Sequence, residues 1–170
     1  MKTDVHIKPF KKVLVANRGE IAIRVFRALS ELGITTVSIY SKEDSYALFR
    51  LKADESYPLN PDLGPVDAYL DIDTIIKIAL AAHVDAIHPG YGFLSENPEF
   101  VDACEKNGIV FIGPSSDIMN AMGDKISSKK LAIEAGVPII SGVDYSIKYA
   151  DEAQKIADEM GIPLKVRIYS

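Results

Sequence analysis

The segment of residues 88–97, HPGYGFLSEN, carries residue types that could bind a small ligand. It follows a short apolar run and combines two glycines, two aromatic residues and a polar Ser-Glu-Asn ending. At the carboxyl edge of a parallel sheet, such a loop can present an aromatic face, Tyr91, to a flat ligand. A rigid structural turn with Phe93 and Leu94 as core anchors explains the same composition. Tyr91 is therefore a candidate binding residue, with the structural role open beside it.

Lys125 is a second candidate, because it follows Met-Gly-Asp where the spacing of the predicted elements changes. A lysine at the start of a second domain can reach a phosphate group in the cleft between domains. A solvated lysine in the first turn of a helix, paired with Asp124, fits the same position. The sequence leaves both interpretations open.

The turn at residues 16–19, ANRG, lies between a strand pattern and a helix pattern, where open α/β sheets bind ligands. A dinucleotide fingerprint requires three spaced small residues, and only the half from Gly19 onward matches. The bulky Arg18 stands where a pyrophosphate would approach the backbone. An acidic pair, Glu43-Asp44, follows the second strand, as a ribose contact would require. NAD binding remains a minor alternative to close helix–strand packing.

Metal and nucleophile chemistry find little support. The three histidines, His6, His83 and His88, are dispersed, and no His-Glu-x-x-His, Gly-x-Ser-x-Gly or Walker lysine motif occurs. His88 ends a predicted buried strand, where a structural histidine is the favoured interpretation. The single cysteine, Cys104, cannot form a disulfide within the chain and fits a small buried side chain. The sequence predicts no metal ligand.

The elements that would position these residues alternate along the chain. Short apolar, β-branched runs indicate strands, and apolar residues on one face of a 3.6-residue period indicate helices. The predicted strands cover residues 13–15, 34–40, 56–59, 85–88 and 109–112. The predicted helices cover residues 20–32, 74–82, 99–106, 117–122, 125–135 and 150–160.

This alternation predicts an α/β fold with a mainly parallel, Rossmann-like sheet and right-handed crossovers. After residue 114 the helices come closer together, so a domain boundary is placed near residues 115–124. We predict a first domain over residues 1–122 and the start of a second over residues 123–170. A last apolar run, residues 162–168, is typical of a further strand.

Composition narrows the class of partner. The net charge of −5 and the pI near 5.2 argue against nucleic acid or an anionic membrane as the main partner. The longest apolar stretch is interrupted by Lys77 and Asp85, and the N-terminus has no apolar core of a signal peptide. We expect a cytoplasmic protein, with a mitochondrial location not excluded.

Six separated blocks resemble one known family: VANRGEIAIRVFRA, ADESY, AYLDIDTII, AIHPGYGFLSENPEF, FIGPS and MGDK. Together they are similar to the N-terminal part of the biotin carboxylase component of biotin-dependent carboxylases, over residues 11–164. The segments SIYSKEDSYALFRLKADESY and GPVDAYLDID resemble the pyruvate carboxylase branch more than the acetyl-CoA, propionyl-CoA or urea carboxylases.

The resemblance implies a function. Members use MgATP to activate bicarbonate and then carboxylate biotin. Their N-terminal layer is Rossmann-like without binding a dinucleotide, and an ATP-grasp domain follows it. By this resemblance Lys125 contacts ATP phosphates, and Tyr91 lies beside the biotin ureido group. The first helix, with Arg24, Arg27 and an exposed Ile23, resembles the family's dimer contact.

The final residues depart from the family. Arg167 stands where members have a nucleotide-binding lysine, and Lys165 is out of register by two, so neither receives that role. The glycine-rich loop, the metal-binding glutamates, the catalytic arginine and base, and the biotin-carrier lysine would lie beyond residue 170. We therefore assign no catalytic residue, take the chain as a truncated N-terminal piece and expect it to be inactive alone.

Two alternatives remain. The biotin carboxylase of an acetyl-CoA or propionyl-CoA carboxylase would share the same motifs. A non-catalytic α/β binding domain that dimerises through Arg24 and Arg27 would need no further residues.

Overall fold

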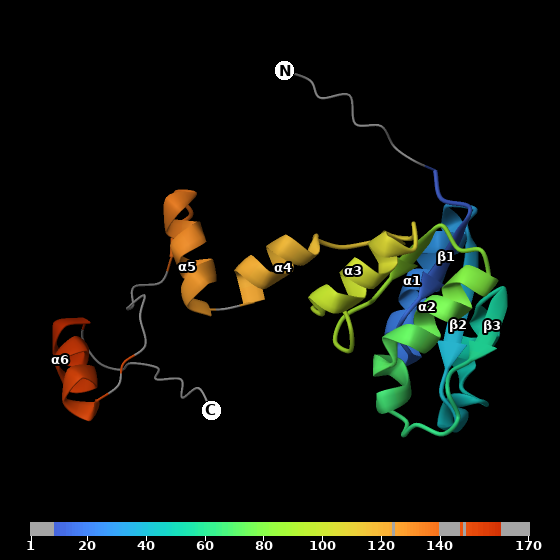
Figure 1. Ribbon diagram of the computed structural model, residues 1–170, viewed down its shortest axis with the longest axis horizontal. Helices are drawn as coiled ribbons and strands as arrows, with labels where there is room; N and C mark the ends of the chain where they lie inside the picture. Colours follow the sequence, from blue (N-terminus) through green and yellow to red (C-terminus); the bar gives the residue numbers. More distant parts are fainter. Residues whose placement is uncertain (1–8, 124, 140–146, 148, 161–170) are drawn as a thin grey trace, which may run out of the picture. The chain divides into compact units, whose positions relative to one another are not determined.

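The computed structural model describes residues 9–123, 125–139, 147 and 149–160 (Figure 1). The chain divides into two compact units, Met1–Asn120 and Ala121–Ser170. The first unit holds the sheet and the candidate loop, so it is the part that positions the site.

All five strands of the first unit form one parallel sheet. They are β1 (Lys12–Val15), β2 (Thr35–Tyr40), β3 (Glu55–Pro58), β4 (Ala86–His88) and β5 (Val110–Phe111). Their spatial order is β3-β2-β1-β4-β5, and each neighbouring pair is parallel. The predicted parallel α/β fold is confirmed. Because the order reverses between β1 and β4, the topological switch point lies at their carboxyl ends.

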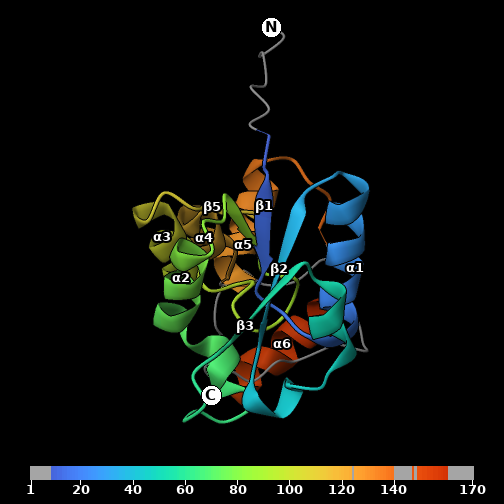
Figure 2. The ribbon, with the colours of Figure 1, turned by 90° about the vertical axis from the view of Figure 1, so that its right-hand side faces the viewer.

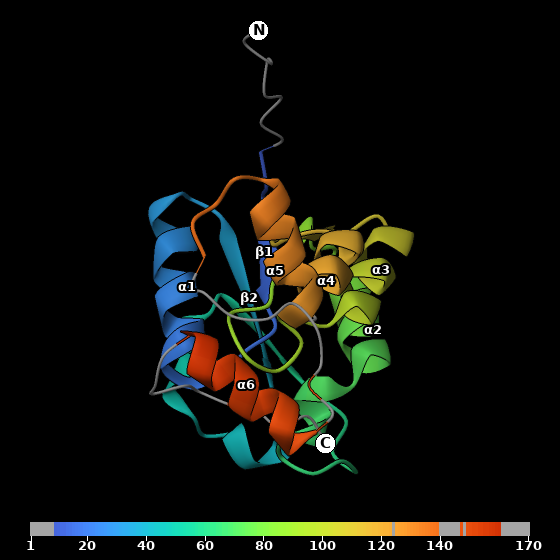
Figure 3. The same ribbon diagram turned by 90° about the vertical axis from the view of Figure 1, so that its left-hand side faces the viewer.

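Helices cover both faces of this sheet, with α1 (Gly19–Glu31) on one side and α2 (Ile72–Ala81) and α3 (Pro98–Lys106) on the other (Figures 2 and 3). The strands are apolar on both faces for this reason. Val13 and Val15 of β1 pack with Phe26 of α1, whereas Leu14 packs with Ile75 and Phe100 of the opposite layer.

The first helix ends one residue before its predicted end, and its buried face differs from the prediction. The period of the sequence predicted that Ile21, Ala22, Val25, Leu29 and Leu32 would be buried together. The buried stripe is instead Ala22, Phe26 and Leu29, and Leu32 is 74% exposed. The helix stops at Glu31, and the chain turns through Gly33 at φ +71°, so Leu32 no longer follows the helical spiral.

Caps define the helices of the other face. Asn97 accepts a hydrogen bond from the Phe100 amide, and Pro98 opens α3, as predicted. For α2, a helix predicted to start at residue 74 favours Asp73 as its cap, and this prediction is wrong. Asp71 is the cap, because its carboxylate accepts from both the amide and the hydroxyl of Thr74.

Shorter elements complete the chain. Among the described residues, the 3₁₀ turns η1 (Lys42–Asp44) and η2 (Leu48–Lys52) lie between β2 and β3, and η3 (Asp67–Leu70) lies between β3 and α2. Helix α4 (Ser116–Gly123) follows β5, and α5 (Lys125–Glu134) and α6 (Ala150–Met160) lie in the second unit. The predicted strand at residues 162–168 lies outside the described residues. The domain boundary at residue 122 and the assignment of residues 123–170 to an ATP-grasp domain stay predictions.

Candidate functional site

The candidate loop, residues 88–97, leaves β4 at the topological switch point of the sheet. His88 is the last residue of β4 and pairs in register with Val15 of β1. The amide of Ala16 donates to the carbonyl of His88 at 2.9 Å, so the two chains remain joined where the strands end. The loop therefore begins at the edge of the sheet where ligands bind in open α/β folds.

Asn17 fastens this loop to the end of β1. Its amide nitrogen Nδ2 donates to the carbonyls of Pro89 and Tyr91 at 2.8 and 2.9 Å. Its Oδ1 accepts from the Arg18 amide at 2.9 Å. The side chain is 2% exposed, so these bonds are made away from solvent.

His88 supports the first bend of the loop. Its Nδ1 accepts a hydrogen bond from the Gly90 amide at 2.9 Å, which requires that this nitrogen carry no proton. Burial lowers the pKa of His88 from its ordinary value. Both observations agree with the structural role that the sequence favoured for His88.

The loop presents one aromatic residue outward and anchors the other inward. Tyr91 is 71% exposed. Phe93 lies with its ring centroid 5.2 Å from that of Tyr69, and Leu94 is buried. The two interpretations of this segment are thus compatible, because Phe93 and Leu94 anchor it while Tyr91 remains available to a ligand.

Asp44, the acidic residue that would contact a ribose near the 16–19 turn, is bonded to other side chains of the protein. Arg18 forms a two-pronged ion pair with Asp44, at 2.7 and 2.5 Å, and Tyr69 donates its hydroxyl to Asp44 at 2.8 Å. The Arg18 guanidinium lowers the pKa of Asp44, and burial raises that of Tyr69. The carboxylate that a ribose would need is therefore engaged within the protein, which argues against NAD binding.

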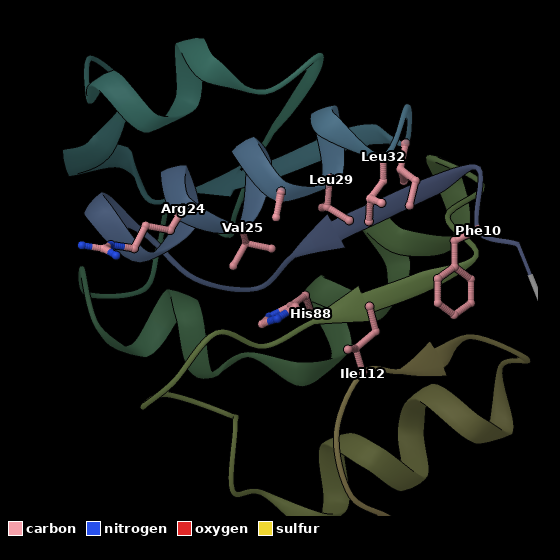
Figure 4. Close-up of a pocket in the computed structure, with 9 residues that line it drawn as sticks. Phe10, Arg24, Val25, Leu29, Leu32, His88 and Ile112 are labelled. Carbon is pink, nitrogen blue, oxygen red and sulfur yellow. The ribbon is translucent and has the colours of Figure 1, made fainter. Parts of the chain in front are cut away.

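A shallow apolar groove of about 440 Å³ lies on the α1 side of the sheet (Figure 4). Figure 4 shows the His88 ring at the end of β4, between Val25 of α1 and Ile112 after β5. Tyr91 is not among the lining residues. The groove and the exposed ring are thus separate features of the same unit.

The second candidate residue, Lys125, and the possible metal ligands complete the survey of the predicted site. Lys125 is the first residue of α5, but its side chain lies outside the described residues, so its distance from Tyr91 is not defined. Across residues 9–123 and the described parts of the second unit, no three His, Cys, Asp or Glu side chains gather as a metal site. In the same residues, no helix has the length and apolar character that a membrane crossing requires.

Comparison with known proteins assigns the chain to a family. Residues 9–119 match the family model described as the biotin carboxylase N-terminal domain. This chain belongs to the biotin carboxylase N-terminal domain family. The match covers the sheet, the Asn17 turn and the 88–97 loop together.

Three relatives illustrate the match. Pyruvate carboxylase 1 of Caenorhabditis elegans is 57% identical over 160 residues, covering 93% of this chain and 14% of that protein. A crystal structure of pyruvate carboxylase from Rhizobium etli gives a TM-score of 0.75 at 56% identity, over 80% of this chain and 13% of that one. A third relative is the biotin carboxylase domain dimer of 2-oxoglutarate carboxylase from Hydrogenobacter thermophilus, in complex with MgADP, ADP and bicarbonate. It gives a TM-score of 0.82 at 50% identity, over 92% of this chain and 34% of that one.

The first helix of this biotin carboxylase N-terminal domain carries its charges on the outer face. Arg24 pairs with Glu20 at 2.7 Å and Arg27 with Glu31 at 3.1 Å, and all four side chains are exposed. The prediction of an exposed Ile23 beside them is wrong, because Ile23 is partly buried against the α1 core cluster. The outer face of the helix is therefore charged rather than apolar.

Two residues of the site were missed by sequence reasoning. Asn17 and Tyr69 received no role, although they hold the loop from the β1 side and from η3. A signal for Asn17 was present, because a polar residue two positions after a buried strand needs a hydrogen-bonding partner if it is buried too. No comparable signal marks Tyr69, which reaches Asp44 and Phe93 only through the folded chain.

Proposed function

We propose that this chain forms the N-terminal part of an ATP-dependent biotin carboxylase and that the natural full-length polypeptide is a pyruvate carboxylase. The observation that carries the proposal is the 57% identity to a pyruvate carboxylase along 93% of this chain. The chain spans 14% of the length of that relative, so the enzymatic activity of the whole protein is itself part of the proposal. ATP with Mg²⁺ would activate bicarbonate, biotin would accept the carboxyl group, and pyruvate would receive it to give oxaloacetate.

The 88–97 loop is suited to the biotin side of this reaction. An exposed tyrosine ring offers a flat face and a hydroxyl to the planar, polar ureido group of biotin. Tyr91 meets these requirements, because it is 71% exposed on a loop that Phe93, Leu94 and the hydrogen bonds of Asn17 anchor. We assign Tyr91 to biotin and Lys125, by its place at the start of α5, to the phosphates of ATP.

The reaction is tested on the natural full-length polypeptide. We expect bicarbonate-dependent ATP hydrolysis, and incorporation of labelled bicarbonate into an acid-stable product with pyruvate as the acceptor. Parallel reactions with 2-oxoglutarate, acetyl-CoA and propionyl-CoA identify other acceptors, the first because a 2-oxoglutarate carboxylase is a 50% identical relative. ATP hydrolysis that is independent of bicarbonate would contradict the proposal. The absence of any ATP hydrolysis would also contradict it and would favour the non-catalytic alternative.

The two binding assignments are tested by separate variants of that polypeptide. Tyr91→Ala should raise the KM for free biotin about tenfold and leave the KM for ATP unchanged, and Lys125→Gln should do the reverse. Tyr46→Ala is the matched control for the first, because Tyr46 is 95% exposed on another loop. Lys130→Gln, an exposed lysine of the same helix, is the control for the second. Equal effects of Tyr91→Ala and Tyr46→Ala would remove Tyr91 from the site.

The partner of the folded domain is proposed to be a second copy, docked through α1. The relative from Hydrogenobacter thermophilus is described as a biotin carboxylase domain dimer, which supports a dimer. The residues in contact, Arg24 and Arg27, are part of the proposal. The cellular compartment stays a prediction, cytoplasm or mitochondrion.

A further inference from the structure

The crevice at the topological switch point is occupied by a side chain of the protein itself. Between β1 and β4 the chain departs in two directions, and open α/β folds use this opening for a ligand. Asn17 lies here, 2% exposed and two residues after the end of β1, and its side chain is bonded to the chain that leaves β4. A polar side chain this deeply buried must find partners within the protein.

The partners of Asn17 define its orientation. Both acceptors of Nδ2 are backbone carbonyls, those of Pro89 and Tyr91, and the two hydrogens of the amide NH₂ group supply one donor for each. Its Oδ1 is used by the Arg18 amide. An aspartate of the same shape would face two carbonyls with a carboxylate, so the amide is required.

The loop approaches Asn17 too closely for any other residue at position 90. Gly90 has φ +67°, and a β-carbon there would lie 2.5 Å from Nδ2 of Asn17. Gly90 is also held by His88, whose Nδ1 accepts from its amide. The backbone from Pro89 to Tyr91 is therefore fixed on both sides.

The direction of the Tyr91 ring depends on this attachment. Its ring is 71% exposed, so packing contributes little to its direction, and its backbone carbonyl is one of the two acceptors of Asn17. We propose that Asn17 is a positioning residue that fixes the Tyr91 backbone so that the exposed ring meets the ureido group of biotin. This inference rests on the proposed function.

The test uses the natural full-length polypeptide and three variants. Asn17→Ala removes both donors, Asn17→Asp keeps the shape and removes them, and Gly90→Ala displaces the loop from the other side. Each should raise the KM for free biotin about tenfold with less than a twofold change in the KM for ATP. Thermal unfolding identifies any variant that fails to fold. Because the three variants change two different residues, the remaining ones still test the inference.

Asp71→Ala is the matched control. It also removes two side-chain hydrogen bonds, those to the amide and hydroxyl of Thr74, but at the start of α2. It should lower stability and leave the KM for biotin within about twofold. An equal rise in that KM would show that general destabilisation, and not the loop, is responsible, and would overturn the assignment.

Two further measurements separate positioning from direct contact and from a failure of the proposed function. If Asn17 acts through Tyr91, Asn17→Ala should add less than twofold to the KM of the Tyr91→Ala variant, and full additivity would overturn the inference. Amide hydrogen exchange of residues 89–92 should accelerate in Asn17→Ala. A wild-type protein that carboxylates no biotin overturns the proposed function and the biotin assignment together. An active protein with an unchanged KM in all three variants overturns the role of Asn17 alone.

Discussion

His88 controls the first bend of the 88–97 loop through a nitrogen that must stay unprotonated. The Gly90 amide donates to its Nδ1, so a proton at that atom would place two donors against each other. Burial acts in the same direction by favouring the neutral ring and lowering the pKa of His88. The loop conformation is thus coupled to pH.

The sign of this coupling follows from the direction of the shift. The unfolded histidine binds a proton near its ordinary pKa of 6.5, and the folded one only at lower pH. The stabilisation is therefore present above about pH 6.5 and is lost as the pH falls through the folded pKa. We expect the free energy of unfolding to decrease from pH 7.5 to 5.5 more in the wild type than in His88→Gln. A ring pKa for His88 at or above 6.5, measured by NMR titration, would contradict this.

At the scale of single residues, the sequence predicted the exposure or burial of a side chain where the local pattern of residue types is enough to decide it. The exposed aromatic, Tyr91, and the anchors, Phe93 and Leu94, were visible in the pattern HPGYGFLSEN. The attachment of the loop to Asn17 spans more than 70 residues of sequence, and no periodicity reports such a bond. Asp44 illustrates the same limit, because its spacing suited a ribose while its folded position pairs it with Arg18.

At the scale of elements, the kind and order of helices and strands followed from the sequence, but the buried face of α1 and the cap of α2 did not. The buried stripe of α1 differs from its prediction because Leu32 lies past the helix end, where the helical period no longer applies. Asp71 and Asp73 are both plausible caps by type, and only the chain direction out of η3 selects Asp71. Local patterns cannot supply that direction.

The α1 surface gives a prediction at this scale. Arg24→Glu combined with Arg27→Glu should abolish a dimer docked through α1, because it places like charges beside Glu20 and Glu31. The fold should survive, since exposed i, i+4 pairs contribute only about 0.5 kcal/mol each. Sedimentation velocity of the natural full-length polypeptide measures the change. Lys106→Glu, at the exposed end of α3, is the charge-reversal control. A dimer that persists in the double variant would place the interface elsewhere.

At the scale of the whole molecule, the buried apolar surface of the described residues is concentrated in the first unit. Its sheet is enclosed by two apolar clusters, one on each face. Among the described side chains of residues 121–160, none is buried, and apolar residues such as Leu131 and Ile133 on α5 are 41% and 51% exposed. Burial of apolar surface provides most of the folding free energy. The described residues of the first unit therefore gain more stabilisation from apolar burial than those of the second.

Hydrogen exchange on the 170-residue chain should reveal this difference. Amides of β1, β2 and β4 should exchange most slowly, through global unfolding, and those of α5 should exchange at least about a hundredfold faster. The comparison is internal, so no variant is needed. Equal protection of α5 and β1 would mean that the second unit is stabilised by contacts that the described residues do not contain.

The two borders of the sheet limit how copies of the chain can associate. β5 has only two residues, and β3 ends at Pro58, which has no backbone N–H to donate. Neither border offers a long row of free backbone groups, so adding a strand from another molecule gains few hydrogen bonds. Runaway growth of one continuous sheet, the first step toward fibrils, is therefore disfavoured at both borders.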